Sequence, residues 1–289
     1  MVYTRKNQRN LTSAERKAFV NAVLELKRRG TYDAFARTHI DFYVSDGDRG
    51  LRVAHMAPSF LPWHRRFLLE FERALQKVDP RVTVPYWDWT RDSSAASSLW
   101  GDDFMGGNGR RGDLQVMTGP FAHAHGHWDI TVNVTDERFL TRDLGRPKNP
   151  IKLPTAADVA QALADPVYDV SPWNSMSGTG FRNKLEGWTK ASGDARFRTH
   201  NQVHRWIGGI MLGGAAVNDP VFWLHHAFVD SLWSRWQAAH PKSKRYLPDV
   251  PPPLGDLQHG RVAALHDPMP PWNVAPAALL DHSRIYRYA

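Results

Sequence analysis

The sequence of 289 residues predicts a mainly α-helical fold in which a four-helix bundle core holds a metal centre, with long irregular loops and few short strands. Three observations support this fold class. Four segments repeat apolar residues at helical spacing, each of them carries histidine on its apolar stripe or near its end, and 42% of the residues are hydrophobic. Facing helices of a bundle can hold a metal between inward side chains. Because no linker divides the chain, we expect residues 1–289 to form a single domain.

The first predicted helix begins after Thr12, which can form a capping box with Glu15, and it ends at Gly30. A capping box satisfies backbone N–H groups that the first helical turn leaves free, and glycine commonly ends helices. The apolar stripe of this helix consists of Phe19, Val20, Val23 and Leu24. A short second helix over residues 32–37 brings His39 near its end.

A longer helix is predicted over residues 59–78, and Pro80 prevents it from continuing. Its buried stripe consists of Phe60, His64, Phe67, Leu68, Phe71, Leu75 and Val78. His64 therefore points inward with the core residues. Residues 45–52 are rich in glycine and aspartate and indicate a loop, so we expect His55 to come from a loop or from extended chain.

The middle of the chain, over residues 92–172, is predicted to be irregular apart from a short helix over residues 155–164. Another long helix is predicted over residues 195–211, with an inward stripe of His200, His204, Ile207 and Met211. His200 and His204 are four residues apart, so they lie on one face of the helix and can bind one ion.

The last predicted helix starts at Asp219, with Pro220 at the first helical position, where the missing N–H of proline is tolerated. Its inward stripe consists of Phe222, His226, Val229, Trp233 and Trp236. His225 lies about 100° further round the helix. Residues 248–253 are predicted to form a loop.

Charge and hydropathy favour neither a nucleic acid nor a membrane as a partner. The formal net charge is +8, but the basic residues are scattered in short groups without a nucleic-acid motif. No apolar run approaches the roughly 18 residues of a membrane span, and we expect no signal peptide because an apolar N-terminal region is missing. Both a cytoplasmic location and export together with a partner protein stay open.

Two groups of histidines have spacings that could close on metal ions: His39, His55 and His64, and then His200, His204 and His226. Cysteine is absent from the sequence. Sites made of imidazoles alone suit copper, zinc or iron better than magnesium or calcium. In zinc proteases a glutamate directly follows the first histidine of the pair, whereas Asn201 stands here. The pattern predicts a paired transition-metal centre and leaves the metal and its chemistry open.

A rival group of histidines consists of His123, His125 and His127. These alternate with small residues next to Gly126, so they could form a tract that collects metal at the surface. We favour a solvated loop, because the tract lies outside all predicted helices.

Four segments resemble the motifs of the type-3 dicopper family, which includes tyrosinases, catechol oxidases and molluscan haemocyanins. They are Pro58–Arg66, Pro85–Trp89, His200–His204 and Asn218–His226. The resemblance to compact actinobacterial tyrosinases covers almost the whole chain. It implies two copper ions, with copper A on the first group and copper B on the second, and dioxygen as co-substrate. It also makes His225 a neighbour of copper B and not a ligand.

The resemblance further implies roles for residues around the metals. Glu186 and Asn201 match a pair that holds a water for deprotonating monophenols, although residues 189–199 are more numerous than in compact relatives. Arg205 and Gly214 match positions at the substrate entrance, and the small Gly214 implies an open entrance. Because relatives often depend on a helper protein that delivers copper, we expect such a helper as a partner besides small phenolic substrates.

The implied activity is that of a tyrosinase, as in melanin biosynthesis. Such an enzyme hydroxylates monophenols at the ortho position and oxidises o-diphenols to o-quinones. One alternative is an o-diphenol or o-aminophenol oxidase without significant monophenolase activity. An alternative from another class is a haemocyanin-like oxygen-binding protein, which would need a blocked entrance.

Overall fold

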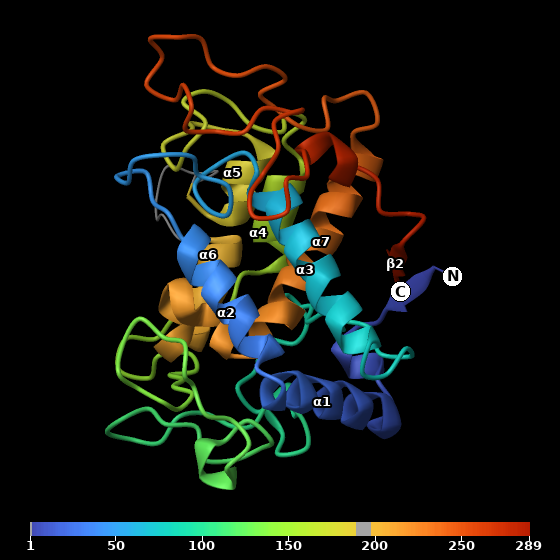
Figure 1. Ribbon diagram of the computed structural model, residues 1–289, viewed down its shortest axis with the longest axis vertical. Helices are drawn as coiled ribbons and strands as arrows, with labels where there is room; N and C mark the ends of the chain where they lie inside the picture. Colours follow the sequence, from blue (N-terminus) through green and yellow to red (C-terminus); the bar gives the residue numbers. More distant parts are fainter. Residues whose placement is uncertain (1, 189–197) are drawn as a thin grey trace.

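The computed structural model describes residues 2–188 and 198–289 and confirms a mainly α-helical fold (Figure 1). The α-helices in this part of the chain are α1 (Ser13–Arg28), α2 (Thr31–Phe42), α3 (Phe60–Gln76), α4 (Ala156–Leu163), α5 (Phe181–Glu186), α6 (Thr199–Ile207) and α7 (Val221–Ala239). Single turns of 3-10 helix lie at Gln8–Asn10, Ser98–Trp100, His123–His125, Gly209–Leu212, Gly214–Asn218 and Pro276–Leu279. The two short strands are β1 (Tyr3–Arg5) and β2 (Tyr286–Tyr288).

The N-terminal helices follow from their capping residues. Thr12 Oγ1 accepts from the backbone N–H of Glu15 at 3.2 Å, and the Glu15 carboxylate accepts from the backbone N–H of Thr12 at 2.9 Å, which confirms the capping box. Gly30 has φ 70° and separates α1 from α2, a conformation that glycine adopts without strain. The prediction for α2 was too short, because the helix continues through His39 to Phe42.

Three histidine-bearing segments pack around the fourth, helix α7, which is buried along most of its length. The ring of Phe71 on α3 stacks on that of Trp223 on α7, with centroids 3.8 Å apart and planes at 4°. Tyr32 on α2 donates its hydroxyl to the carbonyl of Val217, just before α7, at 2.6 Å. Phe35 of α2 packs against Phe67 of α3 and Trp223 of α7, and α6 contacts α7. Helices α2, α3, α6 and α7 thus form the helical core, with long loops outside it (Figure 1).

Two parts of the helix prediction were wrong. The helix expected over residues 195–211 ends at Ile207, because Gly208 adopts φ 68° and residues 209–212 form a 3-10 turn; its first three positions lie outside the described residues. Helix α5 was not predicted. It has six residues, which is too few for a periodic apolar signal.

The strands β1 and β2 pair in parallel, with Tyr3 opposite Tyr286. They place the side chains of Arg5, Tyr286 and Tyr288 against Asp230 on α7, which Arg65 of α3 also contacts. We call this group the Asp230 cluster: Asp230, Arg65, Arg5, Tyr286 and Tyr288. The Arg65 Nε and Tyr286 hydroxyl groups each donate to the Asp230 carboxylate at 2.6 Å. Burial tends to raise the pKa of Asp230, but the guanidinium groups of Arg65 and Arg5 outweigh burial and lower that pKa to about 2.

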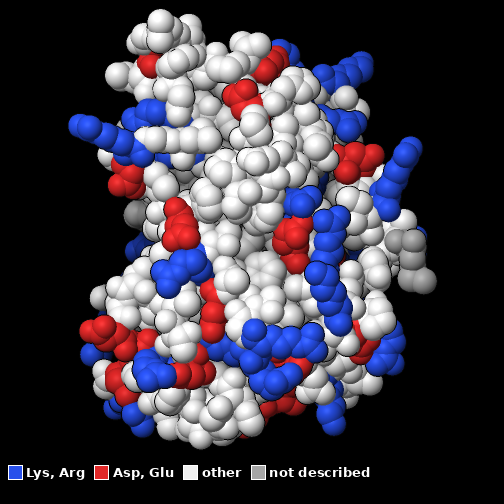
Figure 2. Space-filling view, viewed as in Figure 1, with Lys and Arg blue, Asp and Glu red and all other residues white. Residues whose placement is uncertain are grey.

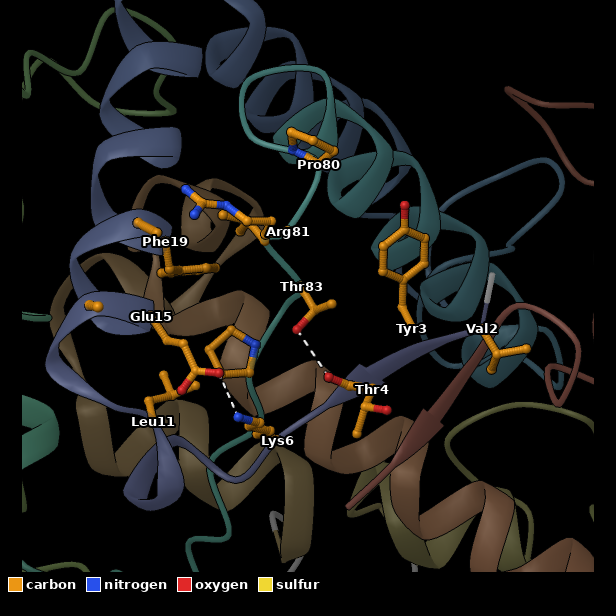
Figure 3. Close-up of a pocket in the computed structure, with 14 residues that line it drawn as sticks. Val2, Tyr3, Thr4, Lys6, Leu11, Glu15, Phe19, Pro80, Arg81 and Thr83 are labelled. Carbon is orange, nitrogen blue, oxygen red and sulfur yellow. Dashed lines mark hydrogen bonds and ion pairs between the residues drawn. The ribbon is translucent and has the colours of Figure 1, made fainter.

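Figure 2 shows acidic and basic side chains intermixed, most densely in the lower part of the view, with a largely uncharged area in its upper centre. Among the helices of the described residues, none has both the length and the hydropathy needed to cross a bilayer. A groove of about 850 Å³ lies between α1, β1 and residues 80–85 (Figure 3). It is bordered by the Lys6–Glu15 ion pair and contains no histidine in its lining.

Candidate metal centre

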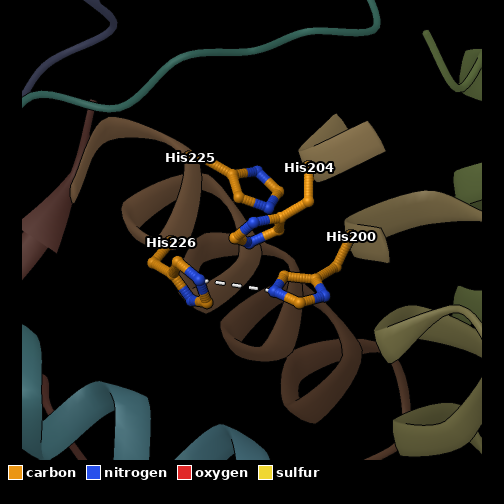
Figure 4. A group of neighbouring side chains, drawn as sticks. All are labelled: His200, His204, His225 and His226. Atoms are coloured by element: carbon orange, nitrogen blue, oxygen red, sulfur yellow. Dashed lines mark hydrogen bonds between the residues drawn. The ribbon is translucent and has the colours of Figure 1, made fainter. Parts of the chain in front are cut away.

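The structure brings the predicted histidines together in two groups. Within each group, the ring nitrogens available for a metal lie within 4.8 Å of one another. The first group is His39, His55 and His64, and the second is His200, His204, His225 and His226. Figure 4 shows the second group, with two rings from α6 and two from α7 turned toward one another. All six predicted ligands therefore belong to groups that could hold a metal ion.

The two groups adjoin each other through α3 and α7. The ring of His64 stacks on the ring of His226, with centroids 4.2 Å apart and planes at 14°. His55 and His200 also approach across the groups, with ring centroids 6.4 Å apart. This arrangement fits a paired centre, as the spacing of the histidines predicted.

Backbone carbonyl groups fix the orientation of three of these imidazoles. The Nδ1 atom of His39 lies 2.6 Å from the carbonyl of Gly214, and that of His204 lies 2.7 Å from the carbonyl of Met211. His64 Nδ1 lies 2.9 Å from the carbonyl of Phe60 in the same way. Because a carbonyl only accepts, Nδ1 must carry the proton in each case, which leaves the lone pair on Nε2.

The nitrogen atoms left over by these contacts fit metal ions. Nε2 of His39, His64 and His204 is buried and has no hydrogen-bond partner within residues 2–188 and 198–289. The Nε2 atoms of His200 and His226 lie 3.3 Å apart (Figure 4), a contact that a cation between or beside the lone pairs would stabilise. Buried polar atoms are seldom left unpaired without a functional reason. Imidazole nitrogens alone suit copper.

Burial also keeps these imidazoles in the form that binds metal. It lowers the pKa of His39 and of His204 to about 4. The pKa values of His55, His64, His200 and His226 are lowered well below their usual range, again mainly by burial. Neutral imidazole is the metal-binding form, so the site needs no deprotonation at neutral pH.

A cavity of about 100 Å³ opens above the two groups. Its lining consists of His39, Tyr43, His55, Met56, Trp188, His200, Asn201, His204, Arg205, Met211, Leu212 and Gly213. Leu212 is 52% exposed and marks the rim. Of the two predicted entrance residues, Arg205 lines the cavity and Gly214 does not. Gly214 is buried behind Tyr43, and a Cβ atom added to it would lie 3.2 Å from the Tyr43 Cβ.

The two candidate catalytic residues also differ in position. Asn201 lines the cavity, and its Oδ1 lies 3.0 Å from His200 Nδ1. Glu186 is fully buried outside the lining. Its carboxylate accepts from the Met56 backbone N–H at 2.6 Å and from Arg182 Nη1 at 2.9 Å. Burial raises the pKa of Glu186, and the guanidinium of Arg182 opposes that effect.

Several residues around the site were missed at the sequence level. Arg182 lies four residues before Glu186, a helical spacing that could have indicated the ion pair. Asp169 accepts from the same guanidinium at 2.7 Å, and burial raises its pKa to about 6 against the effect of Arg182. Trp89 donates to His225, and no local signal links these two residues.

The tract of His123, His125 and His127 is separate from both groups. Its first and second histidines belong to a 3-10 turn, and His125 and His127 are exposed. In the described parts of the chain, the tract is not among the groups whose nitrogens could share a metal.

Replacing His123, His125 and His127 together by alanine is expected to leave phenol oxidation within a few-fold of the wild-type rate. The reason is that none of the three rings lies in the cavity or in either histidine group. Steady-state oxidation of catechol and the metal content after dialysis would check this. Loss of both bound metals in the triple variant would show that the centre has been assigned to the wrong histidines.

Comparisons with known proteins agree with this site. Residues 29–239 match the family model described as the common central domain of tyrosinase. A tyrosinase of Streptomyces antibioticus is 54% identical to this chain over 285 residues, which cover 98% of each protein. The grixazone synthase of Streptomyces griseus subsp. griseus is 46% identical over 314 residues, covering 100% of this chain and 99% of the relative.

The fold has solved counterparts. A polyphenol oxidase from Thermothelomyces thermophila superposes with a TM-score of 0.73 at 23% identity, covering 100% of this chain and 89% of that one. The match to the family model and the identity to whole-length relatives settle the family. This chain belongs to the tyrosinase family.

Proposed function

We propose that this chain is a copper-dependent phenol oxidase that hydroxylates monophenols at the ortho position and oxidises o-diphenols to o-quinones. Copper A would be held by His39, His55 and His64, and copper B by His200, His204 and His226, with dioxygen as co-substrate. The observation that carries the proposal is the pair of adjoining imidazole groups, with their free ring nitrogens, beneath a small cavity. Membership of the tyrosinase family supports copper as the metal.

When bound, the two copper ions would supply the redox change and activate dioxygen. The protein contributes orientation. The carbonyl groups of Gly214, Phe60 and Met211 fix three rings so that Nε2 stays available to a metal. The cavity lining includes the rings of Tyr43 and Trp188, and such aromatic walls suit a flat phenol.

The proton of a monophenol calls for a further group. A phenol has a pKa of about 10 and arrives protonated at neutral pH, and it must lose this proton before its oxygen can bind a metal. Asn201 Nδ2 is buried and has no partner in the described part of the chain, so it can donate to a water in the cavity. Glu186 lies outside the cavity lining but adjoins the site, with its backbone carbonyl 3.3 Å from His200 Nδ1. Each carboxylate oxygen can accept more than one hydrogen bond, so Glu186 would accept one from that water. The water would then pass the phenol proton on to the Glu186 carboxylate, whose pKa burial raises.

Asn201→Ala and Glu186→Gln are each expected to lower hydroxylation of L-tyrosine about ten-fold or more, the lower end of a general-base contribution. Oxidation of L-DOPA should change only a few-fold, because an o-diphenol loses its proton more readily. Steady-state rates on both substrates at saturating copper would measure the ratio.

Asp169→Asn serves as the matched control for Glu186→Gln. Asp169 pairs with the same Arg182 guanidinium, so its replacement disturbs the buried ion pair but leaves the Glu186 carboxylate in place. We expect the ratio of the two rates to stay at the wild-type value in this control. Equal losses on both substrates in Asn201→Ala would contradict the proposed role and indicate that the residue only supports α6.

The o-diphenol or o-aminophenol oxidase differs from this proposal in substrate and not in metal site. The relative named grixazone synthase makes it the specific competitor. Purified protein supplied with copper should form pigment from L-tyrosine after a lag. Turnover of catechol or o-aminophenol without any of L-tyrosine would favour the competitor.

The haemocyanin-like alternative has less support, because the relatives that are 54% and 46% identical over nearly the whole chain carry enzyme names. The cavity also reaches the rim at the exposed Leu212. The helper protein that delivers copper stays a prediction from the family resemblance. Phenol oxidation by purified protein supplied with copper salt alone, compared with protein produced together with such a helper, would test it.

A further inference from the structure

The second histidine group contains one imidazole more than the proposed copper site uses. His225 lies with His200, His204 and His226 in a single set of ring nitrogens (Figure 4). Four imidazoles around one ion would form a closed tetrahedral site, whereas a catalytic site keeps one position open for a reactant. If the site is to keep an open position, another contact must prevent the His225 ring from binding the metal.

The indole of Trp89 supplies that restraint. Its Nε1 donates to His225 Nδ1 at 3.2 Å, and both residues are buried. An indole N–H is a donor only, so His225 Nδ1 must be the acceptor and cannot carry a proton. This is the reverse of His39, His64 and His204, whose Nδ1 atoms face carbonyl oxygens.

An imidazolium carries a proton on both nitrogens and could not accept from the indole, so the contact with Trp89 requires the neutral ring. A neutral imidazole has one proton, and with Nδ1 accepting from Trp89 that proton must lie on Nε2. Neither nitrogen then has a lone pair for a metal: the one on Nδ1 is taken by the indole, and Nε2 is protonated. His225 instead stacks on His200, with ring centroids 5.0 Å apart and planes at 19°.

We propose that Trp89 is a positioning residue that holds His225 in the Nε2–H tautomer and thereby keeps the second metal site at three imidazoles. The stack then uses His225 to orient the ring of His200 without competing for the ion. This inference rests on the proposed metal centre, because it explains why a group of four imidazoles supplies three ligands.

The test is nitrogen NMR of protein labelled with ¹⁵N-histidine, first without metal and then loaded with zinc as a diamagnetic probe. In the metal-free wild type, His225 should show a bare Nδ1 and a protonated Nε2. On zinc loading, six histidine rings should show metal-shifted nitrogens and His225 should not. In Trp89→Phe, the proton of His225 should redistribute to Nδ1, and the number of metal-shifted rings should rise from six to seven.

Trp87→Phe is the matched control. Trp87 belongs to the same short segment and is equally buried, but its indole donates to the carbonyl of Asp92 at 2.9 Å and not to a histidine. This variant should give the wild-type tautomer and six shifted rings. His225→Phe should leave zinc affinity within about two-fold of wild type, because phenylalanine keeps an aromatic ring that can stack on His200 and removes only nitrogens that are not ligands.

Two outcomes would overturn the inference: a metal-shifted His225 in the wild type, or an unchanged tautomer in Trp89→Phe. Should Trp89→Phe fail to fold, the wild-type spectra and the zinc affinity of His225→Phe still decide whether the His225 ring is kept from binding the metal. Failure of the proposed function is distinguishable, because it would show as no metal shift on any of the six rings, whereas the tautomer of His225 is read without metal.

Discussion

Replacing His64 or His204 by alanine is expected to remove one of two bound coppers per chain and to lower phenol oxidation by more than about 100-fold. Loss of a residue that merely orients a ligand already costs 10–100-fold in affinity or activity, and these two residues offer the lone pair itself. In both, Nδ1 faces a carbonyl and Nε2 is buried without a partner in the described residues. Two imidazoles would remain at the affected site.

Copper content after dialysis and steady-state oxidation of catechol would measure this effect. His240→Ala is the control, because His240 is a half-buried histidine whose Nε2 lies 2.7 Å from the carbonyl of Leu163, outside both groups. It should keep two coppers and near wild-type rates. Wild-type protein that holds a single ion, or that holds zinc and acts as a hydrolase, would rule out the dicopper assignment.

The second large effect concerns stability. Asp230→Asn is expected to destabilise the fold by about 3–5 kcal/mol, the usual cost of removing one partner of a buried ion pair. Asparagine keeps the size of the side chain but leaves Arg65 without its counter-charge and Arg5 with Glu72 alone. For a chain of this size, the melting temperature should fall by roughly 10 °C.

Thermal unfolding with and without copper would measure this shift. Asp249→Asn provides the control, since Asp249 pairs with Lys244 at the surface, where such pairs contribute about 0–1 kcal/mol. A melting temperature of Asp230→Asn equal to that of Asp249→Asn would show that the Asp230 cluster does not hold the helices together.

Much of the fold could be predicted because its signals are local. The capping box of Thr12 and Glu15 marks the start of α1, and the helical period of the apolar residues marks α3. The end of α6 could not be placed, because Gly208 turns the chain while its neighbours still follow the apolar pattern. Helix α5 depends on the contact of Arg182 with Asp169 and of Glu186 with the backbone of Met56, which a six-residue stretch does not reveal.

The candidate ligands were predictable for a similar reason. Two of them are one helical turn apart on α6, and the others recur in motifs of known spacing. The tautomer of each imidazole was not predictable, because it depends on hydrogen-bond partners far away in sequence. His39 meets the carbonyl of Gly214, 175 positions away, and His225 meets Trp89, 136 positions away. Gly214, which was expected at the entrance, does not line the cavity, and its carbonyl instead orients the ring of His39.

The parallel pairing of β1 with β2 also determines when the Asp230 cluster can be completed. Arg5 and Tyr288 lie 283 positions apart, so on the ribosome Arg5 is made long before Tyr286 and Tyr288. All six candidate ligands have been synthesised by residue 226, but Asp230 cannot receive its two tyrosine hydroxyls until residue 288 has been added. Contacts of such separation form slowly. The helix pair that carries His64 and His226 is therefore stabilised by residues that are translated well after the last candidate ligand.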